Sequence, residues 1–304
     1  MTYHLRPAVR EQTPIIIGLA GPSKSGKTYS ALRLATGMAA GGKIGMVNTE
    51  GKRGHLYAST FTYEAIDISD SFPYDSYREA LLALKGAGVA VGIIDSMSHA
   101  HEGPGGMLEQ HEKYLDEKAG NDWKKRERLT WAAWIKPKAQ ETLFCNTMIQ
   151  VDFPIILCFR AKEKLKIVKG ADPIELGWQP ICSDRIPFET TATLILPAGC
   201  KGKPDLNALG TELRDPLGTI IQPTQIDEDL GVKLAAWAMG EKKAPPANGI
   251  YITTDQHTDI VDKLKGVSNG EARLKKAAKV ERLSVIPAAD YQKTLDWIER
   301  AKAA

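Results

Sequence analysis

"GPSKSGKT", residues 21–28, lies between an apolar run, "PIIIGLA" at 14–20, and a stretch with helical periodicity, "YSALRLATGMAA" at 29–40. It fits the pattern G-x-x-x-x-G-K-[ST], in which backbone N–H groups point inward at phosphate oxygens. In this pattern the lysine reaches the β- and γ-phosphates of a nucleotide, and the hydroxyl binds Mg²⁺. We therefore expect ATP and Mg²⁺ at this loop, with contacts from Gly21, Pro22, Ser23, Lys24, Ser25, Gly26, Lys27, Thr28 and Tyr29.

Lys24 is an unusual charge within this loop. Most variable positions of such loops face solvent, and a contact with phosphate is the alternative for this side chain.

The composition is that of a soluble globular protein, with 304 residues, 43% hydrophobic and 25% charged. The net charge is only +3, so any nucleic-acid surface must come from local clustering of Lys and Arg. Four widely spaced cysteines argue against a zinc site or a disulfide framework and favour a reducing cytoplasm. No apolar window approaches the roughly 20 residues of a membrane span, and the N-terminus has no apolar leader, so no membrane contact is expected.

Short apolar runs alternate with helical patterns from residue 14 to about 160. Such runs are typical of buried parallel strands, which predicts an α/β fold with a mostly parallel sheet flanked by helices. The sheet is expected to continue through a hairpin at 161–180 and a strand at 190–196. A hydrophilic break with two prolines predicts a linker at 241–249, between a domain at 1–240 and a small helical domain at 250–304.

Two acids follow predicted strands. Asp95 ends the buried run at 89–96, where open α/β sheets bind ligands, so we expect it to hold Mg²⁺ together with Thr28. A strand-capping role is the alternative for Asp95. The next residue is Ser96 and not a glutamate that could activate water, so the catalytic base must lie elsewhere. Glu50 is the candidate, although the residues alone do not separate it from a solvated loop glutamate.

Three motifs in order, "GPSKSGKT", "MVNTEGKRGHLY" and "IIDSMSHAHEG", resemble the core of the RecA-like recombinase family over about residues 14–105. The resemblance implies that Glu50 is the catalytic base, because that family carries a catalytic glutamate after the second strand. It also implies that Tyr57, seven residues farther on, stacks on adenine. A packed core aromatic is the alternative for Tyr57.

Within that superfamily, "IILCFRAKEK" and "GWQPICSDRIPFETTATLIL" resemble later strands of phage-encoded ATP-binding single-strand annealing proteins of the Sak type. Arg160 falls where the family places a polar residue that senses the γ-phosphate, and a surface arginine is the alternative. The resemblance therefore implies a catalytic set of Lys27, Glu50 and Arg160.

Residues 121–140, "NDWKKRERLTWAAWIKPKAQ", combine cations with tryptophans, which suits unpaired nucleic acid. An amphipathic helix with Trp131 and Trp134 in the core is the alternative. Lysines at every second position of the hairpin suit either DNA contact or protection of an exposed strand edge. In RecA-like proteins the loops after the two corresponding strands bind DNA, which favours DNA for both stretches. The expected DNA-binding residues are Lys124, Lys125, Arg126, Arg128, Trp131, Lys162, Lys164 and Lys166.

Three histidines, His99, His101 and His111, lie near glutamates without metal-ligand spacing, so they are predicted to be polar surface residues.

The C-terminal domain resembles the small helical tail of phage recombination proteins, which engages the acidic end of the host single-stranded DNA-binding protein. A simple folded cap is the alternative. Complementary charge is offered by Lys275, Lys276, Lys279 and Arg282.

Together these features predict an ATP-hydrolysing phage protein of RecA-like fold in the cytoplasm of the infected bacterial host. The protein is expected to bind single-stranded DNA, to self-associate into an oligomer or filament, and to promote annealing or strand pairing in homologous recombination. The alternative is a nucleotide-gated loader that recruits replication or recombination proteins and hydrolyses ATP slowly. A small-molecule kinase fits less well, because the later half shows a hairpin and a linker and not a lid and acceptor pocket.

Overall fold

The computed structural model describes residues 13–167, 172–214, 217–239, 254–265, 267, 269–278, 280, 283, 286 and 290–303. Contacts divide the chain into two compact units, Met1–Lys242 and Lys243–Ala304, and each is described by itself. The predicted linker at 241–249 lies outside the described residues. None of the described helices combines the length and the apolar character that crossing a membrane requires.

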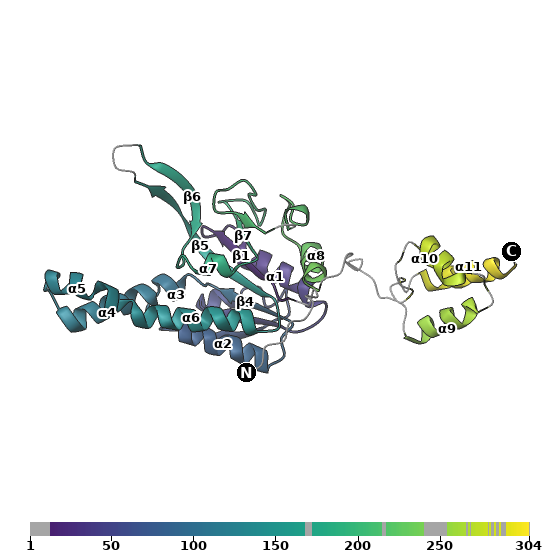
Figure 1. The fold of residues 1–304 in the computed structure, drawn as a ribbon, viewed down its shortest axis with the longest axis horizontal. Coiled ribbons are helices and arrows are strands. Elements are labelled where there is room, and N and C mark those ends of the chain that lie inside the picture. The colour runs from purple at the N-terminus through teal and green to yellow at the C-terminus, as the bar shows by residue number, and fades with distance from the viewer. Residues whose placement is uncertain are drawn as a thin grey trace, which may run out of the picture. The chain divides into compact units, whose positions relative to one another are not determined.

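The first unit is built on an eight-stranded sheet with the strand order β3-β2-β4-β5-β1-β7-β8, and β6 pairs with β5 beside this path (Figure 1). The neighbours from β3 to β7 are parallel, whereas β7–β8 and β5–β6 are antiparallel. The predicted α/β fold with a mostly parallel sheet is confirmed, while β3 and β8 had no counterpart among the predicted strands. The strands are β1 Ile16–Gly21, β2 Ile44–Asn48, β3 Glu64–Asp67, β4 Val91–Asp95, β5 Ile155–Lys166, β6 Ile174–Pro180, β7 Ala192–Ile195 and β8 Glu212–Leu213.

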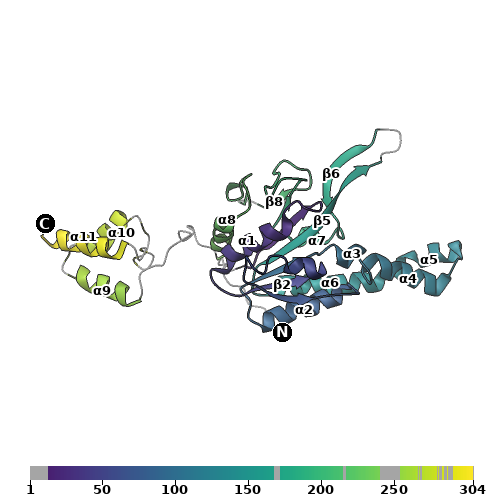
Figure 2. The same cartoon turned by 180° about the vertical axis from the view of Figure 1, so that it is seen from behind.

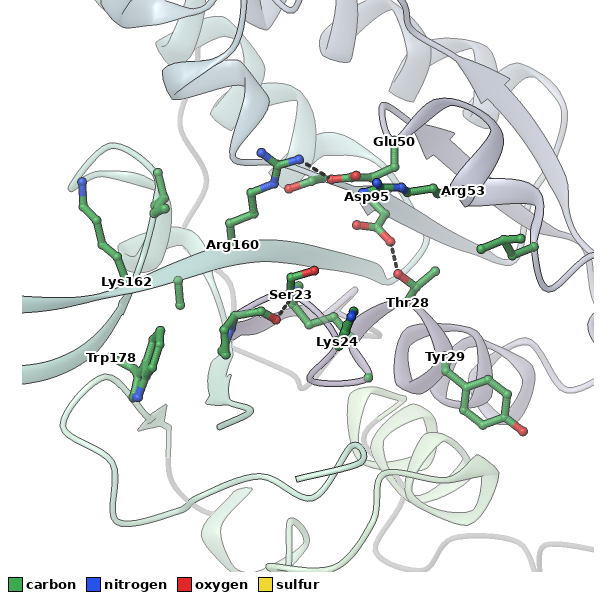
Figure 3. Close-up of a pocket in the computed structure, with 18 of the residues that line it drawn as sticks. Ser23, Lys24, Thr28, Tyr29, Glu50, Arg53, Asp95, Arg160, Lys162 and Trp178 are labelled. Carbon is green, nitrogen blue, oxygen red and sulfur yellow. Dashed lines mark hydrogen bonds and ion pairs between the residues drawn. The ribbon is translucent and has the colours of Figure 1, made fainter. Parts of the chain in front are cut away.

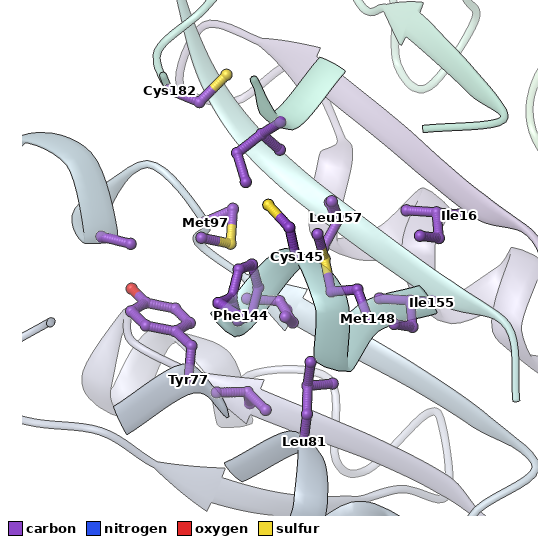
Figure 4. Close-up of a cluster of buried hydrophobic side chains, with 14 of the residues drawn as sticks. Ile16, Tyr77, Leu81, Met97, Phe144, Cys145, Met148, Ile155, Leu157 and Cys182 are labelled. Carbon is purple, nitrogen blue, oxygen red and sulfur yellow. The ribbon is translucent and has the colours of Figure 1, made fainter. Parts of the chain in front are cut away.

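Successive residues of a strand point to opposite sides of the sheet, and here the residues on both sides are apolar. Helices therefore cover both faces. Ile94 faces a cluster with Tyr77 and Phe144 from α2 Tyr74–Gly86 and α6 Ile135–Gln150 (Figure 4). Its neighbour Ile93 faces a second cluster, to which α1 Lys27–Ala39 and α8 Glu228–Ala238 contribute (Figure 2). The strands therefore form the central layer between two helical layers.

Four helices follow β4 where the resemblance predicted a loop: α3 His99–Glu102, α4 Met107–Ala119, α5 Trp123–Ala133 and α6. Helices α4 and α5 form an antiparallel pair that extends from the body of the unit, and we call residues 107–133 the arm (Figure 1). The guanidinium of Arg126 joins its two helices, with N–O distances of 2.5 Å to Asp116 and 2.6 Å to Glu112.

The predicted hairpin at 161–180 is a two-stranded ribbon. Strand β5 runs on beyond the sheet, and its residues 161–166 pair with β6. We call this pair the ribbon, and it also extends from the body (Figure 1). Short elements complete the unit, namely the 3₁₀ helices η1 Gly51–His55 and η2 Leu217–Thr219 and the helix α7 Ile186–Glu189.

The second unit contains the helices α9 Thr254–Leu264, α10 Gly270–Ala278 and α11 Tyr291–Ala303. Its core holds Ile260, Leu274 and Ile298, one from each helix. The hydroxyl of Tyr291 donates a 2.6 Å hydrogen bond to Asp259 and so links α11 to α9. An apolar core shared by three helices, together with this hydrogen bond, suits a compact helical module.

Helices α1 and α8 approach so closely that only glycine fits at two crossing positions. A Cβ atom at Gly37 would lie 1.9 Å from the Glu228 carbonyl oxygen, and one at Gly231 would lie 2.3 Å from that of Leu34. Arg33 adds a forked contact to the Glu228 carboxylate, with Nε at 2.9 and 3.0 Å from its two oxygens. Since α1 follows the phosphate loop, this contact supports the helix that positions the loop.

Gly37→Ala is expected to destabilise the first unit by about 1–3 kcal/mol, because the added methyl group forces α8 away from α1. Gly86→Ala is the control, since a Cβ atom there meets nothing within 4 Å. Thermal melting of both variants measures the effect. An unchanged melting temperature for Gly37→Ala would contradict the close helix contact.

Candidate functional site

The loop at residues 21–28 joins β1 to α1 at the carboxyl edge of the sheet. Gly26 has φ +95°, a left-handed conformation that favours glycine, and it precedes the first residue of α1. The ammonium group of Lys27 donates hydrogen bonds to the carbonyl oxygens of Gly21 at 2.9 Å and Pro22 at 2.8 Å. The loop therefore keeps its lysine folded over the concavity that phosphate groups occupy in loops of this type.

Thr28 and Asp95 meet although they are 67 residues apart in the chain. The Thr28 hydroxyl donates a 2.6 Å hydrogen bond to the Asp95 carboxylate, which lies at the end of β4 and is 3% exposed. Burial raises the pKa of Asp95, and the Thr28 hydrogen bond opposes that rise. Two oxygen donors side by side, one of them anionic, suit a hard cation such as Mg²⁺.

Glu50 lies in the same cleft and is held by two cationic or basic neighbours. Its carboxylate accepts a 2.9 Å hydrogen bond from the Arg160 guanidinium at the sheet end of the ribbon. The His99 Nε2 atom lies 3.8 Å from Glu50, and the His99 Nδ1 atom lies 2.8 Å from the Thr49 hydroxyl. Burial, followed by the charge of Arg160, lowers the pKa of His99. At neutral pH this imidazole is therefore mostly uncharged, and Arg160 is the cation that pairs with Glu50.

These residues surround a cleft of about 800 Å³, within the range of small-molecule sites (Figure 3). Tyr57 lines the cleft and packs edge-on against Tyr29, with ring centroids 5.4 Å apart. Tyr57 also packs against the core cluster that contains α1, so both interpretations of its role keep support. Lys24 lines the cleft as well and is exposed, with φ +66°.

Arg53 is a cleft residue that the sequence did not single out. It lies on η1, and Figure 3 shows its side chain directed toward Glu50 and Asp95. The turn is braced, because the Asn48 amide donates to the Gly51 carbonyl at 2.8 Å and to Asp67 at 2.6 Å. The only sequence signal was its place three residues after Glu50. Arg53 adds its charge to those of Lys24, Lys27, Arg160 and Lys162, which also line the cleft.

The predicted DNA-binding residues fall into two groups. The arm exposes Lys124, Lys125 and Arg128. Arg126 instead forms ion pairs with Glu112 and Asp116, which join α5 to α4. On the ribbon, Lys162 lines the same cleft as Glu50, and Lys164 lies two residues farther on. The side chain of Lys166 lies outside the described residues.

The interpretation of Trp131 as a core residue is wrong, because its side chain is 81% exposed. Trp134 behaves differently: α5 has ended before it, and its ring stacks on that of His111 with centroids 4.1 Å apart. Helix α5 thus ends between the two tryptophans, which removes the shared face expected from their spacing.

The prediction of polar surface histidines is wrong for His111. His111 is 8% exposed beneath Trp134, and His99 and His101 are half-buried. The His99 ring packs against Phe72, with centroids 5.0 Å apart, and the His111 ring packs against Trp134. Among the residues that the structure describes, no group of three or more His, Cys, Asp or Glu side chains could hold a metal ion.

No protein-family model matches this chain, and no curated protein matches it. One similar solved structure is described as a prototypical ATPase from the type III secretion system of pathogenic bacteria, with a TM-score of 0.34 and 9% sequence identity. The match covers 95% of this chain and 80% of that chain. Similarity at this level assigns no activity, and the resemblance to phage annealing proteins stays a prediction.

Glu50→Gln is expected to keep nucleotide binding and to lower kcat for ATP hydrolysis by about 10²–10⁴-fold, because the amide keeps the size of the side chain but cannot accept a proton. Lys27→Ala is the control, since it removes the phosphate-facing charge and should abolish nucleotide binding. Calorimetric ATP titration and steady-state turnover separate the two effects. Turnover near that of the unmodified protein in Glu50→Gln would assign the base to another residue.

Proposed function

We propose that this protein binds and hydrolyses ATP with Mg²⁺, and that single-stranded DNA is the partner on which the nucleotide acts. The observation that carries the first part is the meeting of Lys27, Thr28 and Asp95 at one sheet edge, with Glu50 in the same cleft. A phosphate loop, an oxygen pair for a divalent cation and a carboxylate base are the parts that phosphoryl transfer to water requires.

Each residue then has a distinct role. Lys27 would exchange its two carbonyl partners for phosphate oxygens of the nucleotide. Thr28 and Asp95 would hold Mg²⁺, which would supply positive charge to the phosphates. Glu50 takes a proton from the attacking water. Arg160 exchanges Glu50 for the γ-phosphate and so frees the base when ATP is bound.

Two projecting elements support the DNA partner. The arm carries Lys124, Lys125 and Arg128 together with the exposed ring of Trp131. Charge and an exposed aromatic face are the features with which proteins bind unpaired strands without sequence preference. Arg160, the proposed γ-phosphate sensor, lies on β5, and β5 continues into the ribbon. A DNA contact on the ribbon can therefore act on Arg160 through the same strand.

The proposed biological role is annealing or strand pairing in phage recombination, in the cytoplasm of the bacterial host and as an oligomer or filament. Steady-state ATP turnover with and without single-stranded DNA tests it, together with annealing of complementary labelled strands. Stimulation of turnover by the strand supports the annealing role. Slow turnover that does not respond to DNA would favour a nucleotide-gated loader that recruits other proteins.

Trp131→Ala is expected to weaken single-stranded DNA binding by about 1–3 kcal/mol and to leave the melting temperature unchanged, because the ring is 81% exposed. Ile135→Ala is the control, since that side chain is 70% exposed nearby and has no aromatic face. Fluorescence polarisation with a labelled oligonucleotide measures affinity. Equal losses in the two variants would rule out stacking on Trp131.

We also propose that the second unit binds the acidic end of the host single-stranded DNA-binding protein. Lys276 is exposed on α10, whereas Lys275 pairs with Glu271 at 2.5 Å, and Lys279 and Arg282 lie outside the described residues. Titration of an acidic peptide into the full chain should give a heat signal that Lys276→Glu reduces. Lys265→Glu, at the residue after α9, where Lys265 pairs with Asp262, should reduce it less. The absence of any heat with the unmodified protein would leave the unit as a folded cap.

A further inference from the structure

A second cleft, of about 580 Å³, lies in the first unit and shares no lining residue with the cleft around Glu50. Four segments far apart in the sequence build it. They are helix α3 and the following start of the arm, at His101 and Met107, helix α6 with the residue before it, the ribbon at Lys164, and residues 182–185 before α7. The cleft therefore lies where the arm and the ribbon leave the body of the unit.

Three cations from three different segments line this cleft. Lys138 and Lys164 form no ion pair with any described residue, while Arg185 donates a 2.6 Å hydrogen bond to the Thr142 hydroxyl. The nearest buried acid, Glu141, accepts a hydrogen bond from Ser183, and burial raises its pKa. The lining also contains Asp184, Arg185 lies 3.7 Å from Glu189, and the Lys138 ammonium lies over the Trp134 ring. Three cations against the two acids of the lining still leave a net positive charge, which attracts an anion.

The cleft also has an aromatic and polar side. Trp134 lines it, and the His111 ring stacks on Trp134 with an interplanar angle of 29°, which holds the indole in one orientation. The Nδ1 atom of His101 is buried and has no hydrogen-bond partner in the described part of the chain. A polar ligand that enters here offers the missing partner.

We propose that this cleft binds one nucleotide of a single strand, with its phosphate among Lys138, Lys164 and Arg185 and its base against Trp134. The proposal rests on the proposed function, because it gives the DNA partner a defined binding pocket. Only an unpaired strand can place a base there, since a duplex keeps its bases stacked inside. A volume of about 580 Å³ leaves room for a nucleotide and its hydration.

The position of Lys164 connects this cleft to the other one. Arg160 and Lys164 are four residues apart on β5, which corresponds to about 13 Å of strand. Because β6 pairs with this part of β5, the intervening backbone is part of a two-stranded ribbon. A nucleotide held at Lys164 therefore acts on the strand that carries the partner of Glu50.

The test compares Lys138→Ala/Lys164→Ala with the control Lys113→Ala/Lys118→Ala, which removes the same charge from exposed positions of α4 outside the cleft. Binding of labelled oligo-dT is measured over a salt series, and thermal melting verifies folding. Loss of the single phosphate contact in this cleft should raise Kd at least tenfold at moderate salt and reduce the salt slope by about 0.7, against little change in the control. Equal changes in both double variants would overturn the cleft as the binding place.

A second measurement locates the base directly. Oligo-dT with one 5-iodouracil is irradiated on the full chain, and a cross-link in the peptide around Trp134 is expected. Cross-links confined to Trp123 or Trp131 would overturn a strand nucleotide in the cleft and leave the proposed function standing. Failure of the unmodified protein to bind oligo-dT at all would overturn the proposed function itself.

Discussion

The parallel register of three strands is the constraint on which the candidate site depends. Gly21 pairs with Arg160 across β1 and β5, and Asp95 pairs with Cys158 across β4 and β5. Strand β5 therefore stands between the strand that enters the phosphate loop and the strand that ends in the buried acid. Backbone hydrogen bonds and core side chains on both faces hold this register. If one strand slipped by one residue against its neighbour, each of its side chains would move to the opposite face of the sheet.

Part of this arrangement follows from the sequence. A phosphate-loop pattern needs a strand before it and a helix after it, and an acid at the end of a buried run must reach the same sheet edge. The meeting of Thr28 with Asp95 was predictable in this way, because short-range pattern and parallel topology act together. The same holds for the ribbon, whose turn residues and alternating lysines lie close together in the chain.

Other features depend on packing that the sequence pattern does not contain. Nothing in the spacing of Trp131 and Trp134 marks the end of α5 between them, so their separation into an exposed and a stacked ring was not predictable. The arm was also not predictable from the sequence. The acidic residues of α4 are paired with Arg126 of α5 only when the two helices fold against each other. Arg53 had no motif of its own, and the Asn48 brace that directs its turn is a tertiary contact.

The ion pair between Glu50 and Arg160 is weak, and this weakness allows the proposed mechanism to connect ATP hydrolysis with the ribbon. Its side chains are 20% and 45% exposed, and ion pairs with this access to water contribute only about 0–1 kcal/mol. A γ-phosphate carries more charge than a carboxylate and offers several oxygens, so it can displace Glu50 from Arg160 at little cost. Since Arg160 lies on the strand that continues into the ribbon, the proposed exchange would free Glu50 and change the contacts at the sheet end of the ribbon in one step. A buried ion pair with all of its hydrogen bonds formed would be costly to break in the same position. Nucleotide binding could then not release Arg160, and the proposed connection between the nucleotide and the ribbon would be lost.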